Sequence, residues 1–186
     1  MARTPSNMLP LGTRAPEFNL TDTVSDTHKN LQDLKGTNGT VIMFICNHCP
    51  FVKHVNQGIV ALANNFKDMG IGFVGISSND IENYPQDAPD KMKINALEEG
   101  YPFPYLFDET QQVARDYDAA CTPDFYVFNA DLELVYRGQL DDSRPGNGLP
   151  VTGTDIRNAL NALLGGTEIS EMQKPSIGCN IKWKGQ

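Results

Sequence analysis

The feature that most constrains the fold of this chain is an apolar run that leads directly into a pair of cysteines. The run "TVIMFI", residues 40–45, is almost wholly apolar and rich in β-branched side chains, which is typical of a strand buried on both faces of a parallel sheet. Cys46 and Cys49 follow, and apolar residues then recur at helical spacing over residues 52–66. A second buried strand is predicted at residues 71–77. Because crossovers between parallel strands are nearly always right-handed, we expect a βαβ unit with the cysteines at its first strand-to-helix turn.

The rest of the chain alternates further strands and helices. The polar stretch at residues 78–91 holds two prolines and predicts an exposed loop or a broken helix. The tail, residues 166–186, has no clear periodicity. The remaining expectations are helices at 92–100, 109–117 and 155–164, an edge strand around Leu106, and a strand at 124–129 with its hairpin partner at 134–140.

Composition excludes several classes of function. The formal net charge of -8 argues against nucleic acid as a partner, because binding phosphates needs a basic face. No apolar run approaches the roughly 20 residues of a membrane helix, and residues 1–18 lack the apolar segment of a secretory signal. We therefore expect a cytoplasmic protein. In that reducing compartment, the four cysteines are expected to serve catalysis or metal binding rather than structural disulfides.

The stretch "CNHC", Cys46 to Cys49, has three interpretations: a dithiol that exchanges electrons, half of a metal site, or a pair without a chemical role. If Cys46 begins the helix, the unpaired N–H groups of the first turn favour its thiolate. His48 either adds a positive charge nearby or is a solvent-facing helix residue. The thiolate is the nucleophile, and Cys49, one turn further, can close a disulfide or resolve a mixed one. At such a turn the motif favours a redox dithiol.

Three stretches carry a resemblance to a known family. They are "LGTRAPEFNL" at residues 11–20, "CNHC", and "CTPDFYVF" at residues 121–128. Together they make the chain similar to the thioredoxin superfamily, on the branch shared with peroxiredoxins, the AhpC/TSA and redoxin group. The ending "PSIGCNIKWK", residues 175–184, resembles that of a small peroxiredoxin-like subgroup.

The resemblance spans about residues 9–165 and implies one thioredoxin-like domain over residues 1–186, with 166–186 as its tail. The implied fold is α/β, with a central mixed β-sheet flanked by helices and an N-terminal β-hairpin extension. In this superfamily a cis-proline faces the dithiol, and the residue before it pairs with the substrate chain. Here those residues would be Thr122 and Pro123.

The sequence also departs from its relatives. Thioredoxins have a Trp before the first cysteine and a buried Asp on the preceding strand, whereas this chain has Ile45 and no acid in "TVIMFI". A nearby carboxylate that could deprotonate Cys49 is therefore not expected. Peroxiredoxins carry Pro-x-x-x-Thr-x-x-Cys, and aligning Cys49 with that cysteine puts Ile42 and Cys46 at the Pro and Thr positions. This argues against an efficient peroxidase at Cys49.

Two further cysteines leave alternatives open. Cys121 can be a third redox thiol, a partner for Cys179, or a small buried hydrophobe. Cys179, beside the only Trp, can be a resolving thiol or an ordinary packed residue. A rival interpretation is a zinc or copper site built from Cys46, His48, Cys49 and His54, with Cys121 brought near by folding. Because the spacing from Cys49 to Cys121 is not that of a local zinc module, we expect no metal.

The sequence thus predicts a thiol–disulfide oxidoreductase. Cys46 would attack as the thiolate, Cys49 would resolve the mixed disulfide, and His48 would stabilise the charge. No bound cofactor is expected. The partners would be a protein or small-molecule disulfide and a thiol reductant. The alternatives are a peroxiredoxin-like thiol peroxidase with an antioxidant role and a metal-binding or redox-sensing protein on the same fold.

Overall fold

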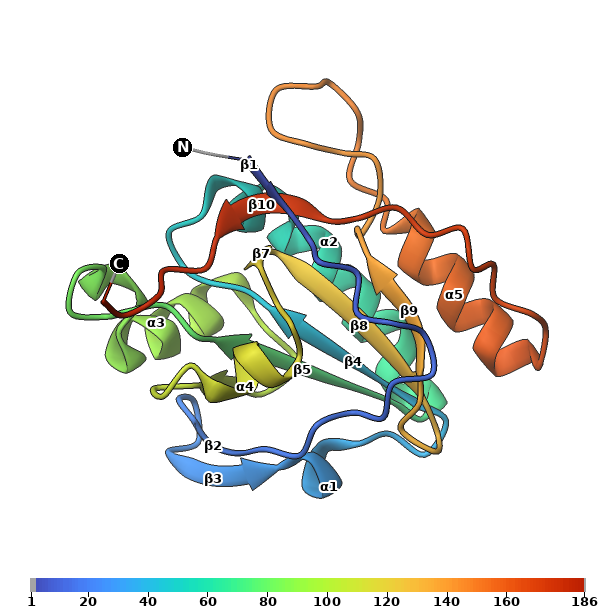
Figure 1. Cartoon of the computed structure of the whole chain (residues 1–186), viewed down its shortest axis with the longest axis horizontal. Coiled ribbons are helices and arrows are strands. Elements are labelled where there is room, and N and C mark those ends of the chain that lie inside the picture. Colours follow the sequence, from blue (N-terminus) through green and yellow to red (C-terminus); the bar gives the residue numbers. More distant parts are fainter. Residues whose placement is uncertain (1–2, 186) are drawn as a thin grey trace.

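Within residues 3–185, which the computed structural model describes, a mixed sheet of seven strands forms the centre of the molecule (Figure 1). β4 (Gly39–Phe44), β5 (Ile71–Ser77) and β6 (Tyr105–Phe107) run parallel, and β8 (Asp124–Asn129) is antiparallel to β4. This is the mixed α/β architecture that the family resemblance implied. The strand order is β3-β2-β6-β5-β4-β8-β9, with β2 at Asn19–Asp22, β3 at Thr27–Asn30 and β9 at Leu134–Gly138.

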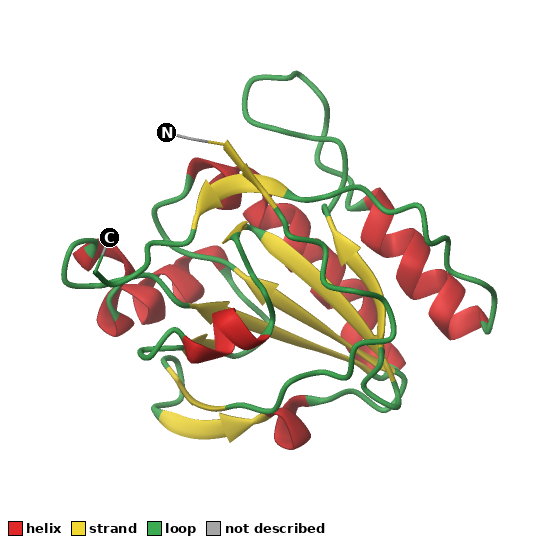
Figure 2. Cartoon of the chain, in the orientation of Figure 1, coloured by secondary structure: helices red, strands yellow, loops and turns green. Residues whose placement is uncertain are grey.

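Helices cover both faces of this sheet (Figure 2). Val41 and Met43 of β4 belong to one buried cluster, and Ile42 and Phe44 belong to the other, because successive side chains of a strand point to opposite faces. A strand buried on both sides must be apolar at every position, which explains the run "TVIMFI". The first cluster includes residues of α2 (Pro50–Phe66), α3 (Pro89–Glu99) and α5 (Thr154–Gly165); the second includes residues of α1 (Leu31–Leu34) and α4 (Gln112–Asp116).

Two sequence expectations need correction in the sheet. The strand at Leu106 is not an edge strand, because β6 lies between β5 and β2. Its prolines, Pro102 and Pro104, precede the strand and so remove no donor from its ladder. The N-terminal hairpin is present as β2 and β3, but it begins at Asn19, near the end of the stretch at 11–20 that suggested it.

A second, smaller sheet joins both ends of the chain. β10 (Ile177–Asn180) lies between β1 (Arg3–Pro5) and β7 (Cys121–Thr122), antiparallel to both. The tail, for which the sequence showed no periodicity, therefore contributes a strand, and Figure 1 shows it crossing above the end of α2. None of the helices between residues 3 and 185 is long and apolar enough to cross a membrane.

Candidate active site

The cysteine pair lies in a short loop between β4 and α2. Ile45 and Cys46 continue from the strand, Asn47 and His48 form a bend, and Cys49 is the N-cap of the helix. The expectation that Cys46 begins the helix is therefore wrong. Pro50 occupies the first helical position, where its missing N–H costs no hydrogen bond, so the helix starts after the second cysteine.

Both sulfurs face the segment that carries the cis-proline. The peptide bond between Thr122 and Pro123 is cis, as the resemblance implied. The Sγ of Cys46 lies 3.3 Å from the hydroxyl oxygen of Thr122, and the Sγ of Cys49 lies 3.2 Å from its carbonyl oxygen. One residue thus contacts both cysteines, although 73 positions separate it from Cys49 in sequence.

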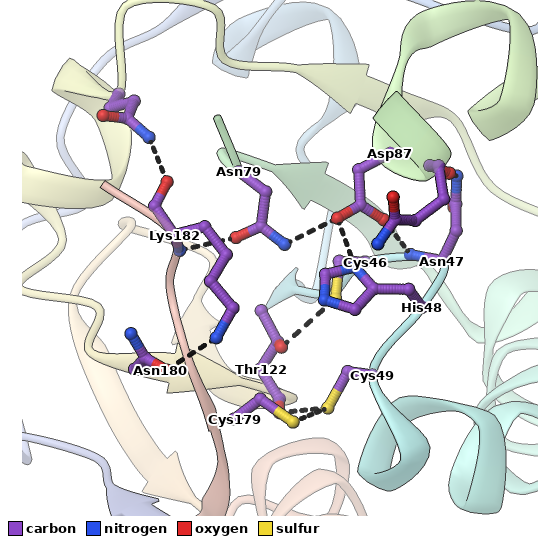
Figure 3. A network of polar contacts seen from close by, with 12 residues as sticks. Cys46, Asn47, His48, Cys49, Asn79, Asp87, Thr122, Cys179, Asn180 and Lys182 are labelled. Atoms are coloured by element: carbon purple, nitrogen blue, oxygen red, sulfur yellow. Dashed lines mark hydrogen bonds and ion pairs between the residues drawn. The ribbon is translucent and has the colours of Figure 1, made fainter. Parts of the chain in front are cut away.

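A buried carboxylate stands on the Cys46 side of the loop (Figure 3). The Oδ2 atom of Asp87 lies 2.6 Å from the Nδ1 atom of His48 and accepts a 2.8 Å hydrogen bond from the side-chain amide of Asn79. Its Oδ1 atom accepts a 2.8 Å bond from the backbone N–H of Asn47. These donors hold Asp87 in place and fix the orientation of the His48 ring, which contacts Asp87 through Nδ1 and keeps Nε2 for another partner.

Aromatic side chains complete this side of the loop. The ring of His48 stacks on Tyr84, with the ring centroids 5.5 Å apart. The Nζ atom of Lys182 lies 5.5 Å from the centroid of the Tyr84 ring. The hydroxyl of Tyr105 donates a 3.1 Å hydrogen bond to the side chain of Asn47. His48 is 18% exposed at its side chain, whereas Asp87 is wholly buried, so the imidazole lies between the carboxylate and solvent.

The polar stretch at 78–91 therefore contributes buried residues to the site and is not simply an exposed loop. Asp87 closes a 3₁₀ turn, Pro85–Asp87, and is buried. Asn79 connects it to the tail, because its Oδ1 atom accepts a 2.9 Å bond from the N–H of Lys182. Sequence reasoning missed Asp87; its only local signal is an acid between Pro85 and Pro89 in a stretch that those prolines make rigid.

The Cys49 side has a different neighbour. Cys179 of β10 places its Sγ 2.8 Å from the Sγ of Cys49, and Figure 3 shows the two sulfurs pointing toward each other. Both cysteines are buried. Of the alternatives for Cys179, the structure favours contact with the dithiol over packing elsewhere.

The two cysteines of the pair have opposite electrostatics. Hydrogen bonds from the Cys179 and Cys46 side chains hold the pKa of Cys49 well below its usual range, with help from the backbone N–H groups of Val52 and Cys179. The hydrogen bond to Cys49, burial and the charge of Asp87 raise the pKa of Cys46. The low pKa was expected at Cys46, but it falls at Cys49, because Cys49 accepts hydrogen bonds from both Cys179 and Cys46.

A second buried carboxyl lies beneath the cis-proline segment. Asp124 is wholly buried at the start of β8, opposite Phe44 in the strand register, and the Tyr126 hydroxyl donates a 3.0 Å bond to its Oδ2 atom. Burial raises the pKa of Asp124 to about 8. The expectation of no nearby acid holds for β4 itself, whereas the loop at 78–91 brings Asp87 to His48.

The other candidate residues lie apart from the dithiol. Cys121 pairs with Asn180 in the small sheet, one position from the Thr122–Cys179 pair, so its side chain points to the opposite face. Burial raises its pKa, which leaves it a protonated, packed thiol. His54 lies one turn into α2, where its Nε2 atom is 2.7 Å from the hydroxyl of Ser143.

The metal interpretation can be tested against the same geometry. Possible ligand atoms of Cys46, His48 and Asp87 lie within 4.8 Å of one another. This group keeps two residues of the sequence-based metal site and has Asp87 in place of Cys49, His54 and Cys121. Tetrahedral zinc with bonds of about 2.0–2.3 Å keeps its ligand atoms about 3.4 Å apart. The 2.6 Å separation of His48 and Asp87 fits a hydrogen bond better than two ligands of one ion.

A model of the AhpC/TSA family matches residues 11–137. No curated protein matches the chain.

Solved structures resemble the whole chain. An uncharacterised conserved protein from Geobacillus kaustophilus is 61% identical, with a TM-score of 0.98 over 100% of this chain and 98% of that one. A hypothetical protein from Sinorhizobium meliloti 1021 is 42% identical, with a TM-score of 0.95 over 98% of this chain and 100% of that one. The thioredoxin domain of a thiol-disulfide oxidoreductase from Bacteroides vulgatus is 18% identical, with a TM-score of 0.62 over 82% and 99%. The last likeness shows the thioredoxin-like fold.

Proposed function

The chain belongs to the AhpC/TSA family, and from that premise we propose that it is a thiol–disulfide oxidoreductase that works through Cys46 and Cys49. The observation that carries the proposal is the position of this pair. The two sulfurs lie at a strand-to-helix turn and both contact Thr122, the residue before the cis-proline. A packed cysteine pair would need neither the imidazole of His48 on the buried carboxylate of Asp87 nor the lowered pKa of Cys49.

In the proposed reaction, Cys46 attacks one sulfur of a substrate disulfide. The proton of Cys46 passes to His48, which Asp87 orients, and the departing substrate thiolate then takes that proton. The Sγ of Cys46 and the first substrate sulfur form the mixed disulfide. Cys49, already a thiolate, attacks the Cys46 sulfur and releases the first substrate sulfur as a thiolate, which takes a proton from water. The substrate gains two electrons, and the enzyme retains a Cys46–Cys49 disulfide.

A thiol reductant must reduce the Cys46–Cys49 disulfide before another turnover. A small thiol or a reductase with its own dithiol supplies the two electrons by the same exchange chemistry. The substrates are thus protein or small-molecule disulfides. If the reduced form is stabilised, as the thiolate of Cys49 favours, the pair accepts electrons readily and works as an oxidant in the opposite direction.

A thiol peroxidase is the second candidate, and the thiolate of Cys49 at the N-terminus of α2 favours it. In that reaction Cys49 would attack a peroxide oxygen and become a sulfenic acid, which Cys46 or another thiol would condense to a disulfide. Cys46 stands where peroxiredoxins have Thr, and Cys49 is buried, so we rank this activity second.

Two measurements test the proposal. A glutathione redox titration of the Cys179→Ser variant, read by alkylation and mass, should give a two-electron Cys46–Cys49 couple between about -270 and -120 mV. In turnover with a disulfide substrate, Cys46→Ser should be inactive, whereas Cys49→Ser should accumulate the mixed disulfide at Cys46. A pair that never oxidises, or full activity in Cys46→Ser, would refute the proposal.

A further inference from the structure

The tail strand occupies the edge that a substrate chain would need. β10 pairs with β7 so that Cys179 stands opposite Thr122, the residue before the cis-proline. The fit is close: a Cβ atom at Gly178 would overlap the carbonyl oxygen of Thr122. An added strand is the usual way in which a sheet edge binds an extended peptide. Here the chain fills that edge with its own residues.

The residue that this strand presents to the dithiol is a cysteine. In an antiparallel pair, residues directly opposite each other point to the same face, so Cys179 and Thr122 both face the cysteine loop. The Sγ of Cys179 lies 2.8 Å from the Sγ of Cys49, closer than any other contact of Cys49 given above. A sulfur on a bound strand, next to the dithiol, occupies the position of the substrate sulfur in a disulfide exchange.

The proton between these two sulfurs has a preferred place. The hydrogen bond between them holds the pKa of Cys49 well below, and the pKa of Cys179 well above, the usual range for a thiol. Cys179 therefore donates and Cys49 accepts. Cys46 also donates to Cys49. Cys49 is thus the shared centre of three sulfurs, with a possible disulfide partner on each side.

We propose that Cys179 is a third redox thiol, which displaces Cys46 from its disulfide with Cys49 by an exchange within the chain. This inference rests on the proposed function, because it starts from a Cys46–Cys49 disulfide. Cys179 attacks the Sγ of Cys49, the Cys49–Cys179 bond forms, and the Cys46–Cys49 bond breaks. The electron pair leaves on Cys46, and the proton that Cys179 loses ends on Cys46. One disulfide and one thiol remain, so the step needs no oxidant or reductant.

The exchange frees Cys46 while it fixes the tail. With Cys49 bound to Cys179, β10 is covalently held across the edge beside Thr122, and the Cys46 thiol remains next to His48 and Asp87. A small disulfide can then react with the Cys46 thiol, whereas an extended protein substrate must wait until the Cys49–Cys179 bond is reduced. The tail thereby makes access of protein substrates depend on the redox state.

Tryptic peptides separate the two disulfides without ambiguity. Cys46 and Cys49 lie in one peptide, residues 36–53, because no Lys or Arg stands between them. Cys179 lies in residues 158–182, since Lys174 is followed by proline. A Cys46–Cys49 disulfide is therefore internal to one peptide, and a Cys49–Cys179 disulfide links two.

The experiment oxidises the protein with glutathione disulfide, quenches it in acid, alkylates it and maps these peptides. We expect Cys46→Ser to yield the linked pair 36–53 with 158–182 as its main oxidised form, and the wild type to yield both forms. Cys179→Ser should give the internal disulfide only. Cys121→Ser, a buried cysteine on the other face of the small sheet, is the matched control and should behave as the wild type.

Each remaining outcome counts against a specific claim. If Cys46→Ser keeps the wild-type melting temperature but gives no linked peptides, while the wild type forms the internal disulfide, the role of Cys179 is refuted and the proposed function stands. A link from residues 116–137, the peptide of Cys121, to 158–182 would also refute it. If neither the wild type nor Cys179→Ser forms the internal disulfide, the proposed function itself is refuted.

Discussion

Two sulfurs only three residues apart in sequence have contrasting surroundings in this molecule. Cys46 lies beside an imidazole and a buried carboxylate, which come from the loop and from residues 78–91. Cys49 lies beside a second thiol, which comes from the C-terminal strand, and beside the N-terminus of α2. The Cys46 side is built for moving a proton, and the Cys49 side for holding a charge and exchanging sulfur partners.

The difference arises from what each sulfur contacts. Cys49, just before Pro50 at the start of α2, accepts hydrogen bonds chiefly from Cys179 and Cys46, whereas Cys46 continues from the strand and lies beside the charge of Asp87. A dithiol is therefore not a symmetric pair whose roles follow from order alone. The elements around the dithiol give Cys46 and Cys49 different chemical roles. Substitutions can therefore disturb the surroundings of one cysteine without disturbing those of the other.

The largest effect on the Cys49 side is expected from Gly178→Ala. The new methyl would overlap the carbonyl oxygen of Thr122, so β10 must shift away from β7. Overpacking of this kind costs about 1–3 kcal/mol, which corresponds to about 5- to 150-fold in an equilibrium. In the Cys46→Ser background, we expect the yield of peptides linked through Cys49 and Cys179 to fall by that factor, as measured by mass spectrometry.

The same substitution at Gly165 is the control. A Cβ atom there meets no atom within 4 Å, and the residue ends α5, so alanine should leave the disulfide pattern unchanged. An unchanged yield of linked peptides in Gly178→Ala, together with wild-type stability, would mean that β10 does not position Cys179 as described.

The largest effect on the Cys46 side is expected from Asp87→Asn. The amide keeps the shape of the carboxylate but orients His48 poorly, and residues that support a reacting group in this way contribute about 10- to 100-fold. We therefore expect exchange to slow by about that factor. Because the charge of Asp87 raises the pKa of Cys46, its removal should also move the midpoint of the pH–rate profile to lower pH.

Asp90→Asn controls for the loss of a charge in the same segment. Asp90 is exposed and paired with Lys91. The exchange rate and the pH–rate profile of Asp90→Asn should therefore match those of the wild type. A lower rate in Asp87→Asn with an unchanged pH midpoint would show a loss of structure rather than a loss of charge beside Cys46. The linked-peptide yield, which depends on the other side, should stay constant in both variants.

This comparison also separates what the sequence could predict from what it could not. The strand over residues 40–45 and the helix that follows were predictable, because burial on both faces and a helical period leave local patterns. The start of the helix was not, since element boundaries depend on one or two residues. The low pKa of Cys49 was not predictable either, because its largest cause is the hydrogen bond from Cys179, 130 positions away.

Partners brought in by tertiary structure left no local pattern. Asp87 reaches His48 across 39 positions, and Cys179 reaches Cys49 across 130. A polar loop with prolines gave no sign that one of its acids is buried, and a four-residue strand such as β10 is too short to show a period. The cis bond before Pro123 came from the resemblance, because the residues alone favoured an ordinary trans bond.

The buried carboxyl of Asp124 offers a way to separate stability from the chemistry of the two sulfurs. Its pKa in the folded protein is about 8, above the value of about 3.9 for a free side chain, so the folded state binds the proton more tightly. This contribution to stability is complete below about pH 4 and is lost as pH rises toward 8, by at most about 1.4 kcal/mol per pH unit. We expect Asp124→Asn to lack this loss.

Urea unfolding at pH 5 and pH 8 measures the effect. The free energy of unfolding of the wild type should fall relative to that of Asp124→Asn between the two pH values. The contribution of the cysteines is the same in both proteins, so it cancels when the two free energies are subtracted. A constant difference would mean that Asp124 is ionised at both. The pH–rate profile of exchange should be similar in the two proteins, because that profile belongs to the loop of Cys46 and His48.

The smallest effect is expected where the two sides meet, at Thr122. Its hydroxyl contacts Cys46 and lowers the pKa of that thiol, whereas its carbonyl contacts Cys49. Thr122→Val removes only the first contact, which is a single hydrogen bond of about 0.5–1.5 kcal/mol, or at most about one pKa unit. The midpoint of the pH–rate profile should therefore rise by up to about one unit in Thr122→Val and stay constant in Thr122→Ser. The yield of the Cys49–Cys179 disulfide should match the wild type in both, because the carbonyl remains in place. A change in that yield, with no shift in the pH midpoint, would mean that the hydroxyl of Thr122 acts on Cys49 rather than on Cys46.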